Sequence, residues 1–528
     1  MKPEQYISRL EKLEGDRRNW DDHWQEVAEV VFPNRSDFTK KVTRGERKNV
    51  KIVDSTAVNA NELLGAGLHG MLTNPASKWF KLRLTDNMLM DDPNIKMWLE
   101  EVERRMYIAL NSPKAKFSSH IHELYLDMTA FGTGTMFIGE DPVTGELTFS
   151  TKHLKECYLA EDSQGFIDTV YRKFEYSARQ IVQKWGIKSA SKDVQSAFEK
   201  NDMDKKFVVI HAVQPRSDFT HGSLNRKDMP IASVYLLRQE KHILEEGGFE
   251  EMPYVAPRWS KVSGETYGRG PGISNLPDIK MLQEMYKTVL KAAQKIVDPP
   301  LQVPDDGALN PVKTVPGGLN FRRAGSDPIT PLQTGGNIPI GEALLNEVRQ
   351  RIRSGFYIDQ LQLQQGPQMT ATEVLQRQEE KLRLMGPVLG RLQSELLGPM
   401  VERVFNIMLR RGKLPPTPEV LADAEYDIEY VSPLARAQKQ TEANSLLRVF
   451  EIGSAIIQTQ PESAQVFNGE DTIRWLATDI FGVPNSLIKS AGEMEQIKQQ
   501  QAEMLEMQQG LAAAQQGADV LQTVSKME

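Results

Sequence analysis

The chain of 528 residues contains one cysteine, Cys157, so no internal disulfide can form, which fits assembly in a reducing compartment. It has no run of 18 apolar residues, and this excludes a helix that spans a membrane. The first residues are charged throughout and lack the apolar centre of a secretory signal, so we expect none there. Excess positive charge is also absent. The 64 basic and 71 acidic residues give a formal net charge of −7, which argues against a broad basic surface that clamps nucleic acid.

Motifs for catalysis are scarce. The chain has neither G-x-x-x-x-G-K-[ST], which cradles nucleotide phosphates, nor G-x-S-x-G, which presents a nucleophilic serine. The glycine-rich segments 131–135 (FGTGT) and 267–272 (YGRGPG) match no dinucleotide-binding pattern, so we interpret them as turns. His120 and His122 lie two residues apart in a predicted helix and point in different directions, which excludes a shared metal ion. We interpret Cys157 as a buried structural thiol, and we expect no catalytic residue, metal or cofactor.

The composition is that of a folded protein, with 40% hydrophobic and 26% charged residues, and the length allows several domains. Residues 1–270 are predicted to form an α+β domain, mostly helical up to about residue 135. The elements predicted after that point are strands at 135–140 and 146–151, helices at 177–186 and 189–201, and strands at 207–215 and 232–239. The whole chain is therefore expected to be α+β and predominantly helical.

A pair of helices with a Pro- and Gly-rich tip is the most distinctive pattern. We predict the first helix at 276–298 and the second at 341–356. Between them, residues 299–339 hold eight Pro and six Gly, with β-like pieces such as GGLNFRR (317–323), which indicates a small lobe at the tip. A slender helical pair has too little surface of its own to bury. We therefore expect its partners to be copies of the same chain, arranged in a ring.

A very long helix is predicted at 370–411, after a Gln-rich break at 360–369. It starts with the capping box Thr370-x-x-Glu373. Gly386-Pro387 and Gly398-Pro399 interrupt it, and each proline removes a backbone hydrogen bond, so we expect kinks. Its apolar stripe consists of Leu375, Leu382, Met385, Leu389, Leu392, Leu396, Val404 and Met408. The Gln- and Met-rich end of the chain carries a short heptad pattern, which fits either a barrel of helices around a ring or a frayed polar tail.

Five blocks in the same order resemble the podovirus head-to-tail connector (portal) family. They are DSTAVNANELLGAGLHGMLTNPASKWFKL (54–82), FGTGT (131–135), PRWSKVSGETYGRGPGISNLPDIKMLQEM (257–285), the block MTATEVLQRQEE…RRGKLP (369–415) and YVSPLARAQ (430–438). The resemblance implies a homo-oligomeric ring, a dodecamer, at one vertex of the virion capsid. It also implies assembly in the host cytoplasm, without a membrane.

The partners that the resemblance implies are the terminase large subunit, the major capsid and scaffolding proteins, a tail adaptor protein and non-specific double-stranded DNA. By resemblance, the segments are a wing at 1–270, stem helices at 271–298 and 340–358, a clip at 299–339, a tunnel loop at 359–369, a long kinked wing helix at 370–413, a C-terminal wing or crown base at 414–490 and a crown or barrel helix at 491–528. The clip residues Asp305, Asp306, Arg322 and Arg323 would then face the terminase or the adaptor.

Both stem helices carry basic side chains at intervals, namely Lys287, Lys291, Lys295, Arg349 and Arg353. In a monomer they are solvated faces, whereas in a ring they become circles of positive charge. DNA that must slide needs few simultaneous phosphate contacts, which an acidic subunit with isolated basic rings provides. In the loop, neutral amides can contact phosphate without trapping it, and the residues that offer them are Gln362, Gln364, Gln365 and Gln368. The loop could equally be an ordinary linker.

Two other functions remain possible at this point. An internal virion or scaffolding protein would be more uniformly helical and would lack the Pro- and Gly-rich lobe. A DNA-processing enzyme, such as a nuclease or an ATPase, would need carboxylate or phosphate-binding motifs that the sequence does not contain.

Overall fold

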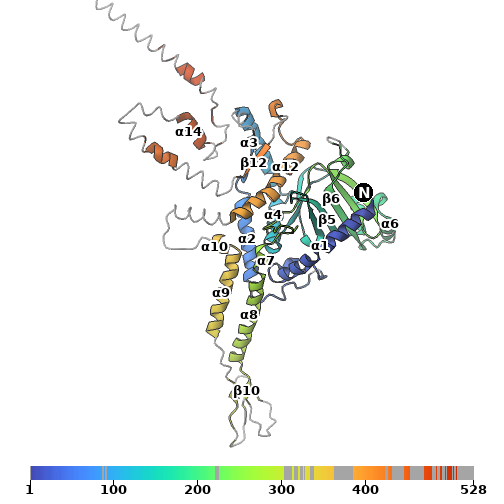
Figure 1. The fold of residues 1–528 in the computed structure, drawn as a ribbon, viewed down its shortest axis with the longest axis vertical. Coiled ribbons are helices and arrows are strands. Elements are labelled where there is room, and N and C mark those ends of the chain that lie inside the picture. The colour runs from blue at the N-terminus through green and yellow to red at the C-terminus, as the bar shows by residue number, and fades with distance from the viewer. Residues whose placement is uncertain are drawn as a thin grey trace, which may run out of the picture. The chain divides into compact units, whose positions relative to one another are not determined.

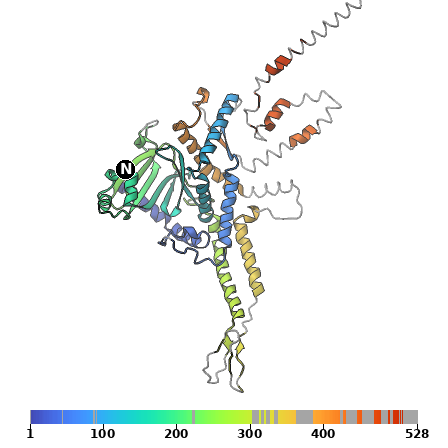
Figure 2. The ribbon, with the colours of Figure 1, turned by 180° about the vertical axis from the view of Figure 1, so that it is seen from behind.

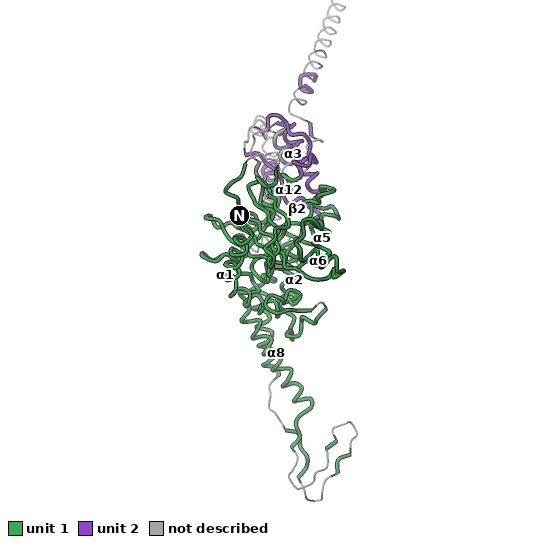
Figure 3. Tube along the Cα trace, turned by 90° about the vertical axis from the view of Figure 1, so that its right-hand side faces the viewer, with its two compact units in different colours: residues 1–75, 109–407 green, residues 76–108, 408–528 purple. Residues whose placement is uncertain are grey.

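The computed structural model describes residues 2–302 except 44, 86–88, 90–91 and 221–224, then 312–313, 319–321, 325, 327–332, 338–361, 385–421, 426–430 and shorter stretches between 445 and 507. The fold is α+β. The chain forms two compact units (Figure 3): unit 1 is Met1–Pro75 with Ala109–Ile407, and unit 2 is Ala76–Ile108 with Met408–Glu528.

The helices of unit 1 include one long amphipathic helix, a pair of short ones and the two helices of the predicted hairpin. In chain order they are α1 (Pro3–Val30), α2 (Thr56–Leu72), α4 (Phe117–Phe131), α5 (Ala178–Trp185), α6 (Lys192–Glu199), α7 (Pro271–Ser274), α8 (Leu276–Val297), α9 (Ile338–Gly355) and α10 (Ile358–Leu361). Two further helices, α3 (Pro93–Leu110) and α12 (Gly398–Arg410), cross the boundary between the units.

Among its described residues, unit 1 contains three sheets, all antiparallel. Their strands are β2 (Thr135–Glu140), β3 (Leu147–Lys152), β4 (Cys157–Glu161), β5 (Ile167–Ser177), β6 (Lys206–Pro215), β7 (Ile231–Leu237), β8 (His242–Phe249), β9 (Tyr254–Val255), β10 (Leu301–Gln302) and β11 (Thr330–Pro331). The largest sheet has the order β4-β5-β6-β7-β8, in which each strand pairs with its sequence neighbour. A smaller sheet has the order β3-β2-β9, and its β2–β3 hairpin confirms the prediction for this segment.

Both faces of the five-stranded sheet are covered, because successive residues of each strand point to opposite faces. On β6, Ile210 and Ala212 pack with Tyr6 and Leu10 of α1. The alternate residues of β6 instead join a second cluster, formed with α5 and α6 around Ile181. This explains why β6 reads as a nearly continuous apolar run. Both short helices begin at a serine whose side chain accepts a backbone hydrogen bond at the N-terminus.

The predicted helical hairpin is present as α8 and α9, which lie side by side (Figures 1 and 2). Helix α9 begins earlier than predicted, at Ile338, because Pro339 occupies the first turn, where a proline is tolerated. We call the pair α8–α9 the arm. The buried residues of α8 all lie in its first half, between Leu276 and Gln283, so the rest of α8 is largely solvent-exposed.

The β-like piece GGLNFRR predicted at the tip of the arm lies mostly outside the described residues. Its described residues, 319–321, form no strand. The ladder pairs Leu301 and Gln302 with Thr330 and Pro331, close to where the chain leaves α8 and re-enters α9. Asn320 supplies a substitute for strand pairing, because its amide donates to the Lys313 carbonyl and accepts from the Lys313 N–H, at 2.8 and 2.7 Å.

The described part of the long helix starts at residue 385 and continues through α12. The interruption predicted at Gly398-Pro399 takes the form of a π-helical segment, Gln393–Leu397. There the N–H of Gly398 donates to the carbonyl of Gln393, five residues earlier. Pro399 has no N–H to donate to the carbonyl four residues before it, so one α-helical hydrogen bond is missing there. The wider π-helical turn lies at the site of this missing bond. Leu392 and Leu396 are fully buried, as the stripe predicts, while Leu389 is only half-buried.

Unit 2 is built around a strand pair that the sequence analysis missed. Strand β1 (Phe80–Leu84) pairs antiparallel with β12 (Tyr426–Tyr430), far away in the chain. On α3, Glu103 accepts a hydrogen bond from the Leu82 N–H at 2.9 Å. Unit 2 also contains α14 (Gly469–Trp475). Within the residues that the structure describes, no helix is both long and apolar enough to span a membrane.

Candidate functional site at the base of the arm

The two glycine-rich segments pack directly against each other at the base of the arm. Gly132 ends α4 with a φ of 80°, and a Cβ there would lie 2.2 Å from the Gly268 carbonyl oxygen. Cβ atoms at Gly270 and Gly272 would lie 2.7 and 2.4 Å from carbonyl oxygens of α4. Our interpretation of these glycines as turn residues is therefore right for Gly132, but Gly268, Gly270 and Gly272 serve close backbone approach.

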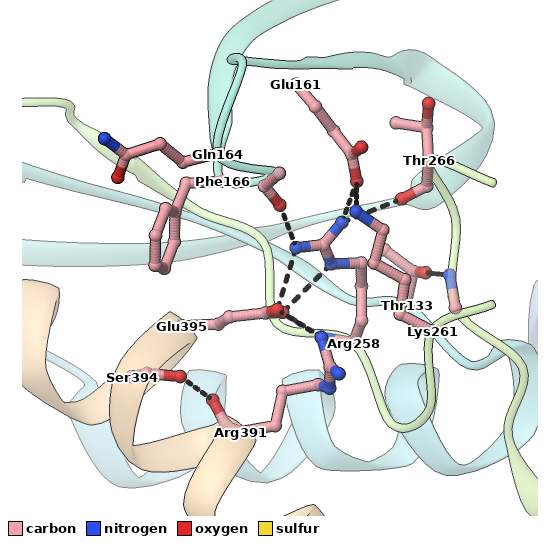
Figure 4. Close-up of polar contacts among 12 residues, drawn as sticks. Thr133, Glu161, Gln164, Phe166, Arg258, Lys261, Thr266, Arg391, Ser394 and Glu395 are labelled. Atoms are coloured by element: carbon pink, nitrogen blue, oxygen red, sulfur yellow. Dashed lines mark hydrogen bonds and ion pairs between the residues drawn. The ribbon is translucent and has the colours of Figure 1, made fainter. Parts of the chain in front are cut away.

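The same region holds a buried arginine whose charge is fully paired. Arg258 is 1% exposed, and each of its five guanidinium N–H groups has an acceptor. Nε and Nη2 donate to the Glu395 carboxylate at 3.0 and 2.8 Å, and Nη1 donates to Glu161. The two remaining donors reach the carbonyls of Thr266 and Gly165, at 3.3 and 2.8 Å. Figure 4 shows the guanidinium lying between Glu161 and Glu395.

Further basic groups surround these carboxylates. Lys261 Nζ lies 2.7 Å from Glu161 Oε1, and Arg391 donates to Glu395 Oε1 at 2.9 Å. The backbone N–H of Arg258 also donates to Glu395, at 3.0 Å. Because Glu395 belongs to the π segment, this Arg258 cluster fixes the widened helical turn to β4 and to the chain that leads into the arm.

A second cluster joins α2 to both helices of the arm. Asp54, which is 6% exposed and precedes α2, accepts from Arg349 Nε and Nη2 of α9 at 2.9 and 2.7 Å. Gln283 of α8 accepts from the N–H groups of Val53 and Asp54 and donates to the Asp54 carbonyl at 2.7 Å. We call this set the Asp54 latch. It holds the arm to the rest of unit 1 at the level where α8 becomes exposed.

Hydrogen bonds make the Asp54 carboxylate easy to ionise. Burial alone would raise its pKa, but hydrogen bonds from Thr56 and Arg349 outweigh burial and hold the pKa below its ordinary value. Arg349 also lies over the ring of Tyr286, 5.5 Å from the ring centroid. The arm is thus fixed at its base by charge, amide and aromatic contacts together.

Comparison with known proteins identifies the family. Residues 3–488 match the family described as bacteriophage head to tail connecting protein. The chain belongs to this connector family. It is 32% identical over 525 residues to the probable portal protein of Bordetella phage BPP-1, covering 97% of this chain and 93% of that protein. It is 30% identical over 537 residues to the portal protein of Salmonella phage epsilon15, covering 99% and 96%. It is also similar to the portal protein of Enterobacteria phage T3, at 22% identity over 78% of this chain and 75% of that protein.

As a portal protein, this connector joins the phage head to its tail. The basic residues of the arm that the sequence analysis named differ in their exposure and contacts. Lys287 contacts Glu284 on its own helix at 2.7 Å, and Lys291 and Lys295 are exposed. Arg353 is exposed on α9, whereas Arg349 belongs to the Asp54 latch. The structure therefore gives Arg349 a contact within the subunit that the sequence analysis did not foresee.

Some residues singled out in this connector lie outside the described residues. They are the loop glutamines Gln362, Gln364, Gln365 and Gln368 and the clip residues Asp305, Asp306, Arg322 and Arg323. Most of the C-terminal heptad pattern lies outside as well; of its residues, Met504 and Met507 are described and are exposed.

The neighbouring histidines and the cysteine have separate surroundings. His120 lies 3.5 Å from Glu123, while His122 has its ring 6.1 Å from that of His69, so the two point to different partners. Among the described residues, no three His, Cys, Asp or Glu side chains are grouped as a metal site requires. Burial raises the pKa of the Cys157 thiol to about 11, which leaves very little thiolate at neutral pH.

Sequence reasoning missed the Arg258 cluster and the Asp54 latch because their members are far apart in the chain. Arg258 and Glu395 are separated by 137 residues, and Asp54 and Arg349 by 295. One signal was available. Three of these residues lie in blocks that carry the family resemblance: Asp54 opens the first, Arg258 stands in the third and Glu395 in the fourth.

Proposed function

We propose that this connector assembles, through its arms, into a ring that encloses a channel for double-stranded DNA. The observation that carries the proposal is the contrast along the arm. Its base is fixed by the Asp54 latch, whereas further out the apolar side chains of Leu290 and Leu344 are 41% and 48% exposed. Apolar helix faces of this kind are stable when a neighbour covers them. In a ring, each arm has two such neighbours.

In this proposal the arm is the stem and residues 299–339 are the clip, which meets the terminase large subunit during packaging and the tail adaptor afterwards. The remainder of unit 1 serves as wing, together with unit 2 and its C-terminal crown. The ring is a dodecamer, set in the capsid by the major capsid and scaffolding proteins. The subunit itself catalyses no reaction and instead forms a passive conduit, with packaging energy supplied by the terminase.

The loop of residues 359–369 is proposed to contact DNA in the channel. Two firmly held elements flank this part of the chain. Before it stands α9, held through Arg349, while α10 includes its first residues, and further along the chain comes the helix that Glu395 ties to Arg258. Neutral amides of Gln362, Gln364, Gln365 and Gln368 would touch phosphates weakly, which suits DNA that has to move.

Negative-stain images of the purified chain test the ring directly, since particles with a central hole are expected. Particles that stay monomeric over a broad concentration range would overturn the proposal. Deletion of Gln362–Gln368 tests the loop, because rings should still form while DNA packaging or retention falls. If that deletion abolishes ring formation, the loop has a structural role and its proposed contact with DNA is wrong.

A further inference from the structure

The faces that two neighbouring arms bring together can be derived from the arm itself. This step rests on the proposed ring. Two close contacts set the register of the hairpin: a Cβ on Gly341 would lie 3.0 Å from Val289 Cγ2, and one on Gly355 would lie 2.0 Å from Asn275 Oδ1. Fourteen residues separate the two positions on each helix, so α8 and α9 run level with each other over this length. By this register Leu290 is level with Ile340.

Each helix carries an exposed stripe with apolar members that lies off the face turned to its partner in the hairpin. On α9, Ile340, Leu344 and Glu347 are spaced four and three residues apart and share a face. Both apolar members are well exposed, at 59% for Ile340 and 48% for Leu344. The buried residues Leu345, Val348 and Ile352 lie on the adjoining face of α9.

On α8, the corresponding stripe contains Lys287 and Leu290, three residues apart. Leu290 is 41% exposed, and Lys287 is 41% exposed at its side chain. Its contact with Glu284, which is 74% exposed, is of the surface type that stabilises little. Lys287 can therefore turn to another carboxylate at small cost.

We infer that the α9 stripe Ile340–Leu344–Glu347 of one subunit packs on the α8 stripe Lys287–Leu290 of the next. Rotation about an axis parallel to the arm moves every level of one arm onto the same level of its neighbour. Leu290 then meets the neighbour's Ile340 and Leu344. Glu347 lies four residues from the level of Lys287, about 6 Å along the helix, which a lysine side chain spans. The contact combines an apolar centre with one ion pair of opposite charges.

This assignment gives Lys287 a role in assembly and leaves Lys291 and Lys295 as candidates for the channel wall. The assignment also agrees with the opposite signs of the charges on α8 and α9. The outer half of α8 carries Lys287, Lys291 and Lys295, whereas α9 carries Glu342 in its outer half and Glu347 near its middle. Like charges on facing helices would repel, so the order α8 against the neighbour's α9 is favoured over α8 against α8.

The experiment uses two full-length variants, Leu290→Cys and Leu344→Cys, assembled from an equal mixture and treated with a short bismaleimide. Only different subunits can then be joined, and the buried native Cys157 does not react appreciably. We expect a cross-linked dimer at least five-fold more abundant than with the control partner Glu342→Cys. Glu342 is also exposed on α9 but lies off the stripe, two residues from both Ile340 and Leu344.

Equal yields with Leu344→Cys and Glu342→Cys, in rings that form normally, would overturn the inference and leave the proposed ring intact. Failure of the wild-type chain to form rings would instead overturn the proposed function. A charge exchange provides a second measurement. Lys287→Glu should lower the fraction of rings at limiting concentration at least three-fold, and adding Glu347→Lys should restore it. Loss of rings in the double variant as well would count against the pair, and Glu284→Gln, which removes only the contact within α8, should have no effect.

Discussion

Arg258 is buried among its hydrogen-bond partners, so its surroundings tolerate little change. Its positive charge is buried, and Glu395 contacts both the side chain and the backbone N–H. Glu395→Gln keeps the shape but removes the negative charge, so the guanidinium is left with Glu161 as its acidic partner. Breaking a buried pair on one side costs roughly 3 kcal/mol, because a charge remains without compensation. We expect a lower melting temperature by calorimetry and faster hydrogen exchange in residues 385–397.

The control for this variant is Glu284→Gln, which removes an exposed pair on α8. Exposed pairs contribute little, so the melting temperature of this variant should stay near that of the wild type. Equal melting temperatures for both variants would show that the Arg258 cluster does not stabilise the long helix.

Asp54 should make the arm sensitive to acid. Its folded pKa lies below the ordinary value of about 3.9, so its contribution is present above that value and is lost as pH falls through the folded pKa. In the wild type, hydrogen exchange of α9 should therefore accelerate below about pH 4, relative to that of α5. Asp54→Asn should show faster exchange of α9 already at pH 7. Unchanged protection of α9 in that variant would argue against the latch.

Arg351→Gln serves as the control for the latch. It removes an exposed contact with Asp278 of α8, at 3.8 Å, and leaves Asp54 untouched. The exchange of α9 at its base should then remain close to that of the wild type. The comparison separates an effect of the latch from any general loosening of the arm.

At the scale of elements, local patterns predicted what lies within one window of sequence. Periodicity, capping residues and turn residues predicted three features: the hairpin β2–β3, the helices α5 and α6, and the arm helices. The pair β1–β12 could not be found in this way, because each strand has its partner hundreds of residues away. The Arg258 cluster and the Asp54 latch were missed for the same reason. The helices that carry Gln283, Arg349 and Glu395 were predicted from the sequence, but the contacts that these residues make were not.

The glycine contact between α4 and the segment 267–272 shows how an element depends on the absence of a side chain. Gly132→Ala would place a methyl group against the Gly268 carbonyl at a φ that alanine avoids. We expect several kcal/mol of destabilisation and loss of soluble protein. Gly45→Ala is the matched control, because Gly45 has a φ of 81° with open space around it. It should cost about 1 kcal/mol, and equal losses in both variants would refute the close packing.

At the scale of the whole molecule, the net charge bears on how the proposed ring would hold DNA. Each subunit has a formal net charge of −7, so such a ring would repel DNA in general and attract it only at the proposed basic circles. Few phosphates are then neutralised at one time, and each contributes about −0.9 to the slope of log K against log salt. For purified rings and a short linear duplex, anisotropy titrations should give a slope smaller in magnitude than about 5. A slope near −10 would indicate a tightly gripping basic surface, through which DNA could not slide, and would contradict the proposed channel.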